Sequence, residues 1–483
     1  MITESIWSQS CRIAARPQLK ENIETEVAVI GAGLAGLLIA ERLQREGKEV
    51  VILEAERIAG GQTKNTTAKI TAQHGCIYAT LIRRFGQEKA KEYALANRRA
   101  VEWYRQYIKQ EKIDCDFELQ DAFLYSQSQR TKMQNEAAAC QALGLSAEFI
   151  EKIELPFPVA GAVCMKGQAQ FHPLRFVHHI ADKLKIYENT RVTKVKNGLL
   201  YCDRAAVKAK QVIFACHYPF VNYPGLFFVR MHQTRSYVLA LENAPELNGM
   251  YIDAEQGGYS FRRYQNLLLL GGGGHRTGKN STGGKYALLQ RAAEDMFPGC
   301  RIVAQWSAQD CMTVDEVPYI GRFSKSRPNW YVVTGFGKWG MTSAALAAEI
   351  LTDLLCKKKN SALSLFTPHR FPVINAVKIP GEGLESAKGL IKENLSVPRI
   401  VLENLPVGHG GIVEQNGKKV GVYRESEEKY YTVQTQCPHL GCQLEWNPDE
   451  KSWDCPCHGS RYDYKGHLID NPAQKVNINI KEE

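Results

Sequence analysis

The order of apolar and polar positions predicts a strand, a turn, a helix and a second strand near the N-terminus. An apolar run covers 26–30, the glycine-rich GAGLAG follows, an amphipathic stretch extends to Gly47, and a second apolar run covers 49–53. Short apolar runs bounded by turn residues are typical of buried strands, and an apolar face that recurs every three to four positions is typical of a helix. This order is the one found in nucleotide-binding βαβ units.

Beyond this unit, the same patterns predict a mixture of helices and strands. Residues 87–112 have helical periodicity, and strands are expected over 117–127 and within 230–274. Residues 329–335 predict a strand, and 341–355 predict a helix rich in strong helix formers. Both ends of this long part therefore contribute to one nucleotide-binding domain.

The last part of the chain has a different pattern. From Thr367 to Pro398 the periodicity weakens into Pro, Gly and Lys, which predicts a connector. The short alternating runs that follow predict a small antiparallel β domain. The expected fold class is an α/β Rossmann-type domain with a β-rich substrate domain, plus a C-terminal all-β domain. The expected boundaries are a first module over 1–370 (nucleotide-binding parts at about 25–80, 160–225 and 310–360, with the substrate subdomain between them), a linker over 371–398 and a second module over 399–483.

Composition and charge narrow the class of protein. The hydrophobic fraction is 44% and the charged fraction 23%, ordinary values for globular domains. No apolar run approaches the ~18 residues that a membrane span needs, and the N-terminus does not resemble a secretory signal. Fourteen cysteines in such a chain argue against a secreted disulfide scaffold. We expect a cytoplasmic protein with no membrane span and no nucleic-acid partner.

The net charge of +10 is unevenly distributed between the two modules. Residues 399–483 contain ten Lys and Arg against thirteen Asp and Glu, a net charge of −3, which leaves +13 for residues 1–398. Two interpretations stay open: lysines scattered over a solvated surface, or electrostatic docking of the small module on the large one.

The glycine-rich turn has the form of a dinucleotide-binding site. Gly31, Gly33 and Gly36 follow a predicted strand and begin a predicted helix, so the backbone can turn tightly and present N–H groups to a pyrophosphate. Glu54, at the end of the second strand, can accept hydrogen bonds from ribose hydroxyls. Leu34 and Ala35 complete the candidate binding turn. NAD and FAD share this pattern.

Three further segments resemble D-amino-acid-oxidase-like flavoproteins: AERIAGGQT after Glu54, PYIGR at 318–322, and GFGKWGMT at 335–342. The resemblance covers most of 25–356 and implies FAD as the cofactor. It also implies that the helix beginning near Met341 points its N-terminus at the pyrimidine end of the flavin, where it would stabilise negative charge. The cofactor-binding residues that it adds are Arg57, Gly61, Gln62, Thr63, Gly335, Gly337, Trp339, Gly340, Met341 and Thr342.

The same resemblance implies hydride transfer from the C–N bond of an amine or amino acid to the flavin. Many members place an arginine for the substrate carboxylate where this chain has Asp310, counted back from Gly321. An aspartate there favours a cationic amine, although a structural aspartate in a turn is an equal alternative. Arg262 is a candidate for the missing cation. Cys311 does not match the register of a covalent flavin tether, so we expect noncovalent FAD.

Two short boxes near the C-terminus contain ligands for a metal centre. CPHLGC at 437–442 and CPCHGS at 455–460 each supply one thiolate and one imidazole, from Cys437 with His439 and from Cys455 with His458. Two thiolates on one iron and two imidazoles on the other describe a Rieske 2Fe–2S centre. Tetrahedral zinc accepts the same ligand types and is the alternative.

Residues 399–480 resemble respiratory Rieske proteins. The resemblance implies a disulfide between Cys442 and Cys457, and O–H donors to the cluster from Ser460 and Tyr462. It also implies a covering loop at 470–472. Such donors stabilise the reduced cluster and raise its potential. The imidazole-bearing iron is expected at the domain surface, where transfer partners approach.

A two-electron carrier joined to a one-electron carrier predicts a dehydrogenase. Hydride from a small-molecule substrate, an amine by resemblance, would enter at FAD. Electrons would leave singly through the cluster to a one-electron acceptor protein or a quinone-like acceptor. A reductase with reversed flow and a non-enzymatic redox sensor are the alternatives.

Overall fold

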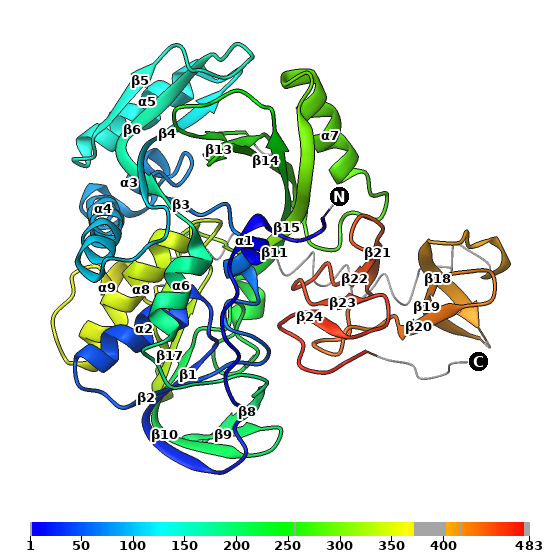
Figure 1. Ribbon diagram of the computed structural model, residues 1–483. Coiled ribbons are helices and arrows are strands. Elements are labelled where there is room, and N and C mark those ends of the chain that lie inside the picture. The colour runs from blue at the N-terminus through cyan, green and yellow to red at the C-terminus, as the bar shows by residue number, and fades with distance from the viewer. Residues whose placement is uncertain (1, 256, 371–401, 416, 478–483) are drawn as a thin grey trace.

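Two modules lie side by side in the computed structural model, which describes residues 2–255, 257–370, 402–415 and 417–477 (Figure 1). We call the described residues up to 370 the large module and those from 402 the small module. The predicted linker at 371–398 lies outside the described residues, so the module boundaries stay predictions.

The first sheet of the large module is the nucleotide-binding one. Its strand order is β16-β17-β10-β1-β2-β7, with β9 pairing β10 and β8 pairing β9. The pairs that β1 makes with β10 and β2 are parallel, as a βαβ unit requires. The strands are β1 (Ile23–Ile30), β2 (Val50–Leu53), β7 (Ile186–Tyr187), β8 (Val192–Lys196), β9 (Leu199–Cys202), β10 (Ala206–Phe214), β16 (Tyr319–Ser324) and β17 (Arg327–Thr334).

Helices cover one face of this sheet (Figure 1). α2 and α8 pack together through apolar side chains such as Leu37, Leu38, Leu346 and Ile350, all within one buried core. The helical segments of the large module are α1 (Ile6–Ser10), α2 (Leu34–Arg45), η1 (Gln62–Asn65), α3 (Tyr78–Phe85), α4 (Gln87–Glu111), α5 (Arg130–Ala142), α6 (Pro173–Ala181), η2 (Phe227–Val229), α7 (Lys285–Met296), α8 (Gly340–Leu355) and α9 (Leu363–Phe366).

The second sheet forms the β-rich part of the large module. Its order is β15-β11-β14-β13-β12-β4-β6-β3, with β5 beside β6. The strands are β3 (Lys69–Ile70), β4 (Glu118–Ser126), β5 (Ala147–Ile150), β6 (Gly161–Gln170), β11 (Met231–Glu242), β12 (Met250–Asp253), β13 (Ser260–Tyr264), β14 (Leu267–Arg276) and β15 (Arg301–Thr313). The predicted strand regions 117–127 and 230–274 both fall in this sheet.

The small module consists of two antiparallel sheets, as its alternating pattern predicts. One has the order β18-β19-β20 and the other β21-β22-β23-β24. The elements are η4 (Leu402–Asn404), β18 (Gly410–Gln415), β19 (Lys418–Arg424), β20 (Tyr430–Gln434), β21 (Glu445–Asn447), β22 (Ser452–Asp454), β23 (Arg461–Asp463) and β24 (Leu468–Asp470). The two cysteine and histidine boxes are the loops beside β21, β22 and β23.

Candidate flavin and iron-sulfur sites

A cavity of about 780 Å³ gathers most of the predicted cofactor residues. It lies at the carboxyl ends of β1 and β2 and extends to β11, β14 and β15 of the second sheet. The predicted residues that line it are Gly31, Gly33, Leu34, Ala35, Glu54, Gly61, Gln62, Thr63, Asp310, Gly335, Gly337, Trp339, Gly340 and Met341. Four predicted residues, each described by the structure, lie outside the lining: Gly36, Arg57, Arg262 and Thr342.

The glycine turn leaves a bare backbone at the start of α2. Gly31 has φ +107°, and a Cβ there would lie 2.6 Å from the carbonyl oxygen of Ala215. A Cβ on Gly36 would lie 2.0 Å from the oxygen of Gly31, so Gly36 serves close packing within the turn. At Gly33 a Cβ would meet only the Thr63 hydroxyl, at 3.4 Å, and the position faces the cavity. This turn and the N-terminus of α2 form a ready site for a pyrophosphate.

Glu54 and Thr63 hold the loops around this turn. Glu54 accepts hydrogen bonds from the backbone N–H groups of Ala32 (2.7 Å) and Glu56 (2.9 Å). Burial raises the pKa of Glu54, and these two N–H donors oppose that effect. The Leu34 N–H donates to the Thr63 hydroxyl at 3.0 Å. The acidic group expected for a ribose therefore lies beside the expected pyrophosphate site.

The N-terminus of α8 reaches the cavity on its other side. Gly335 and Gly337 have positive φ and lead into Gly340, the first residue of the helix. Trp339 stacks on His74 with ring centroids 4.8 Å apart. Burial lowers the pKa of His74 to about 3, so this ring is neutral. His74 belongs to no motif, and only the fold brings it to α8.

Contacts with His74 and its neighbours account for the position of Thr342 outside the cavity lining. Its Nε2 is 3.0 Å from the Thr342 hydroxyl, and its Nδ1 is 2.7 Å from the Tyr93 hydroxyl. Thr342 also donates to the Thr71 carbonyl. Thr342 therefore anchors the start of α8 to the segment after β3 instead of lining the cavity.

The structure separates the two residues proposed to orient a substrate. Asp310 lines the cavity from near the C-terminal end of β15 and not from a turn, and a structural role stays the alternative. Burial raises its pKa, while Lys338, His217 and Arg235 act in the opposite direction. Arg262 is not among the residues that line the cavity.

The guanidinium of Arg262 is occupied by structural contacts. It donates to Gln170 Oε1 at 2.9 Å and to the carbonyls of Ala68 and Phe171, each at 3.0 Å, and only 1% of Arg262 is exposed. Lys69 of β3 lines the cavity, as do Arg191, Arg276 and Lys338. Burial, with a smaller effect from Arg262, lowers the pKa of Lys69 to about 7. Sequence reasoning missed Lys69 because a single lysine carries no motif.

Arg57 also makes structural contacts. Its Nε donates to Glu188 Oε1 at 3.1 Å and its Nη2 to the Ile13 carbonyl at 3.0 Å. It thereby ties the segment after β2 to the N-terminal part of the chain.

The four predicted cluster ligands lie together in the small module. Cys437, Cys455 and His458 are each at most 2% exposed, and the rings of His439 and His458 are 4.9 Å apart and nearly perpendicular. The thiol of Cys455 lowers the pKa of Cys437 to about 7 against the effect of burial. His439 Nδ1 is buried without a hydrogen bond, whereas its Nε2 lies 2.7 Å from Asn222 Oδ1. A buried, unpaired imidazole nitrogen beside two thiols fits a metal centre ligated through that nitrogen.

The residues expected around the cluster are also in place. Cys442 and Cys457 form a disulfide, which confirms that prediction. Ser460 and Tyr462 both contribute to lowering the pKa of Cys437, while the Tyr462 hydroxyl is buried without a hydrogen bond to a described residue. The covering loop is tied to this shell because the Ala473 N–H donates to the Ser460 hydroxyl at 3.0 Å.

Comparisons with known proteins match both modules. The family model "FAD dependent oxidoreductase" matches residues 26–354, and the model "Rieske [2Fe-2S] domain" matches 400–480. The chain belongs to the FAD-dependent oxidoreductase family. Its Rieske domain confirms the 2Fe–2S cluster over zinc, and its family confirms FAD.

Relatives and solved structures agree with this assignment. The "Putative Rieske 2Fe-2S iron-sulfur protein YhfW" of Bacillus subtilis is 37% identical over 98% of this chain and 96% of its own. Gamma-glutamylputrescine oxidoreductase of Escherichia coli is 23% identical over 82% of this chain and 99% of its own. The crystal structure of glycine oxidase from Geobacillus kaustophilus superposes with a TM-score of 0.61 at 17% identity, covering 72% of this chain and 99% of that one, and shares the fold. Among the described residues, none of the helices has the length and apolar character to cross a membrane.

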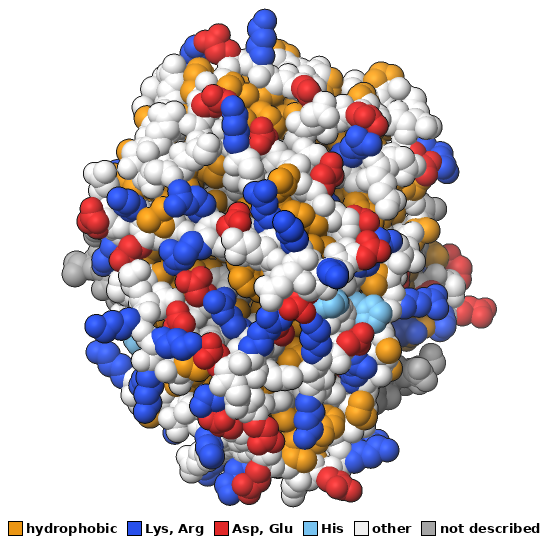
Figure 2. Space-filling view, turned by 60° about the vertical axis from the view of Figure 1, so that its left-hand side comes forward, with side chains coloured by type: hydrophobic (Ala, Val, Ile, Leu, Met, Phe, Trp, Pro, Cys, Tyr) orange, Lys and Arg blue, Asp and Glu red, His pale blue; other side chains and the backbone are white. Residues whose placement is uncertain are grey.

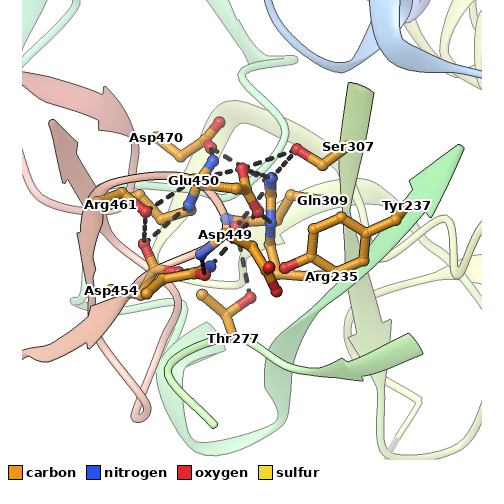
Figure 3. A network of polar contacts seen from close by, with 12 residues as sticks. Arg235, Tyr237, Thr277, Ser307, Gln309, Asp449, Glu450, Asp454, Arg461 and Asp470 are labelled. Carbon is orange, nitrogen blue, oxygen red and sulfur yellow. Dashed lines mark hydrogen bonds and ion pairs between the residues drawn. The ribbon is translucent and has the colours of Figure 1, made fainter. Parts of the chain in front are cut away.

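A buried ion-pair network joins the Rieske domain to the flavin module (Figure 3). Glu450 of the small module pairs with Arg235 of β11 and, at 2.7 Å, with Arg461 of β23. Ser307 of β15 donates to Glu450 Oε2 at 2.7 Å, and Arg461 also pairs with Asp454 at 3.0 Å. Burial acts to raise the pKa of Glu450, but the two arginines hold it well below its usual range. The signs of Arg235 and Glu450 match electrostatic docking.

A second contact uses a helix end. Asp449 accepts hydrogen bonds from the backbone N–H groups of Gly284 (3.1 Å) and Lys285 (2.9 Å), where α7 begins. The small module therefore caps a helix of the large one. Elsewhere Lys and Arg side chains are spread among acidic ones over the face in Figure 2, as the scattered interpretation of the charge expects.

Replacing Gly33 with valine should remove FAD without unfolding the chain. The new side chain would point into the cavity where the pyrophosphate is expected, while its Cβ meets only an ordinary contact. We expect FAD affinity to fall at least tenfold, which is about 1.4 kcal/mol. The measurement is bound flavin per chain after gel filtration. Unchanged circular dichroism and cluster absorption are the controls, and stoichiometric FAD would contradict this placement of the turn.

Glu450→Gln should weaken docking, because it leaves two buried arginines without their shared carboxylate. Breaking a buried pair in this way costs about 3 to 5 kcal/mol, measured as a lower urea midpoint, with exposed Glu414→Gln as the matched control. The ionised carboxylate adds stability above its unfolded pKa of about 4.3. The folded pKa of Glu450 is lower than the unfolded one, so the contribution declines as the pH falls below the unfolded pKa and is lost once the pH passes the folded pKa. Equal midpoints for Glu450→Gln and wild type would show that the network does not stabilise the docked state.

Proposed function

We propose that the protein is an amine dehydrogenase whose FAD receives hydride and whose Rieske cluster passes the electrons singly to an external acceptor. The observation that carries this proposal is that the small module forms part of the wall of the flavin cavity. Leu468, Ile469, Asp470, Asn471 and Gln474 of the small module line the same cavity as the glycine turn. A flavin in that cavity would therefore lie directly beside the domain that holds the cluster.

The chain binds and orients the flavin with backbone groups more than with charges. The turn at Gly31 and Gly33 would present N–H groups to the pyrophosphate, and Glu54 would accept a hydrogen bond from a ribose. The N-terminus of α8, at Gly340, favours negative charge on the reduced ring. Bound FAD supplies the hydride acceptor.

The cavity wall favours an amine as the substrate. Asp310 would hold a cationic nitrogen by a charge-assisted hydrogen bond. Gly271, Gly272 and Gly274 of β14 line the same cavity. The relative named for gamma-glutamylputrescine supports an amine substrate of this kind. Lys69, with its pKa near 7, is a cavity side chain that could take up a proton.

The surroundings of the cluster support electron flow from the flavin to the cluster. The hydroxyls of Ser460 and Tyr462, which lie beside Cys437, would stabilise a more negative, reduced cluster by donating to its sulfurs. Electrons are therefore drawn from the flavin to the cluster. The partner that removes them is a one-electron acceptor protein or a quinone-like acceptor.

Asp310→Asn should raise the amine concentration that half-reduces the flavin, with FAD content unchanged. Losing one charge-assisted contact costs about 1.5 to 3 kcal/mol, or roughly ten- to a hundredfold. The measurement is anaerobic flavin bleaching at increasing amine concentration. Asp295→Asn, on the exposed face of α7, is the matched control. An unchanged concentration dependence would return Asp310 to a structural role.

The function itself is tested with a panel of amines and the variant His458→Ala. An amine should bleach the flavin of both proteins in a single turnover. Only the wild type should then show a reduced Rieske signal and turn over with a one-electron acceptor such as ferricyanide. If no amine bleaches the flavin, the substrate class is wrong. If His458→Ala turns over at the wild-type rate, the cluster is a sensor or a structural element.

A further inference from the structure

The second cluster-binding box is held by side chains of the flavin module. Four consecutive carbonyl oxygens of this box each accept a hydrogen bond across the interface. Arg276 donates to Pro456 O (3.0 Å) and Cys457 O (3.2 Å). Gln233 donates to His458 O at 2.7 Å and Gln309 to Gly459 O at 2.8 Å. The loop that supplies two cluster ligands is therefore bound by the flavin module at four consecutive carbonyls.

The same contact is closely packed. Gly459 has φ +82°, and a Cβ there would lie 2.6 Å from Gln233 Cβ. Gly278, just after β14, has φ +75°, and its Cβ would lie 2.5 Å from Pro456 N. Gln233 and Gln309 are at most 1% exposed. The second cluster-binding box thus contacts the flavin module directly, with no other residues between them.

Two neighbouring strands separate this box from the flavin cavity. Side chains alternate along a strand, and in β11 His232 and Thr234 line the cavity while Gln233 points to the box. In β15 Asp310 lines the cavity while Gln309 points to the box. Faces of packed sheets are about 10 Å apart. A single β-layer therefore lies between the two sites.

Hydrogen bonds cross this layer. Gln62, which lines the cavity, accepts from the backbone N–H of Gln309 at 2.7 Å. Gln309 Nε2 donates to Gln233 Oε1 at 2.7 Å, and Gln233 also donates to the Asn471 carbonyl at 3.0 Å. A continuous path therefore joins the cavity wall to His458 and to the covering loop.

The two histidines predicted to bind the cluster also face the flavin module. His439 Nε2 lies 2.7 Å from Asn222 Oδ1, and the His458 ring packs edge-on against Phe228, with ring centroids 5.9 Å apart. Asn222 lies in the loop after β10 and Phe228 in η2, so both contacts come from the large module. The transfer partner that approaches the imidazole-bearing iron is thus, in this structure, the flavin module itself.

We propose that Gln233 and Gln309 are positioning residues of a fixed internal bridge, across which flavin and cluster exchange electrons without movement of the Rieske domain. The proposal rests on the proposed function for the direction of flow. Each electron that crosses oxidises the flavin by one equivalent and reduces one ferric ion to ferrous. The one-electron acceptor removes it before the second electron crosses, and full oxidation of the anionic reduced flavin releases one proton to water.

Two variants loosen the bridge in different ways. The double variant Gln233→Leu with Gln309→Leu removes its hydrogen bonds. Gly278→Ala instead places a methyl group against backbone atoms of the box while leaving both glutamines and all four cluster ligands in place. Gln305→Leu is the matched control, because Gln305 lies on β15 but accepts its hydrogen bond from Gln290 of α7.

The experiment needs no amine, so it can fail independently of the proposed function. Light with EDTA as the electron donor reduces the bound flavin anaerobically, and the cluster absorption then reports the internal transfer. We expect transfer to slow at least tenfold in both loosened variants and to match wild type in Gln305→Leu. FAD content and the electron paramagnetic resonance spectrum of the dithionite-reduced cluster should be unchanged. FAD-depleted Gly33→Val measures any direct photoreduction of the cluster.

A viscosity series separates a fixed bridge from a moving domain. With a fixed bridge, the wild-type transfer rate should stay the same as sucrose is added. A rate that falls in proportion to viscosity would overturn the proposal in favour of domain movement. Wild-type rates in both the double glutamine variant and Gly278→Ala would overturn it as well.

Discussion

The arrangement of the two modules depends on one buried carboxylate shared by two arginines. Glu450 joins Arg235 of the flavin module to Arg461 of the Rieske domain, and all three side chains are almost completely buried. Ions removed from water require close partners, and buried Arg235 finds its carboxylate partners across the interface, in the docked register. That register also places the second ligand box against β11 and β15.

The strand periodicity then determines what each side of the interface can do. Because neighbouring side chains alternate between two faces, β11 and β15 can carry cavity residues on one face and docking residues on the other. Asp310 and Gln309 are adjacent in sequence, yet one belongs to the flavin cavity and the other contacts the cluster loop. Two chemically different environments are thus built from one pair of strands.

The sequence predicted those parts of the structure that depend on local spacing. The glycine turn, the two ligand boxes and the strands and helices around them are encoded within short segments, so their types and order could be predicted. Lys69, His74 and Glu450 could not, because their roles come from contacts between distant segments. Arg262 was proposed for its charge alone, and the sequence does not show that backbone carbonyls already surround its guanidinium.

The segment from Leu468 to Gln474 has two neighbours at once. It contributes to the wall of the flavin cavity, and Ala473 within it bonds to Ser460 in the shell of the cluster. A substitution in this segment therefore alters the surroundings of both redox centres together. Neither domain of this protein can be exchanged freely for the matching domain of another protein. Without the segment from Leu468 to Gln474 and its neighbours, the flavin cavity and the cluster shell would both be incomplete.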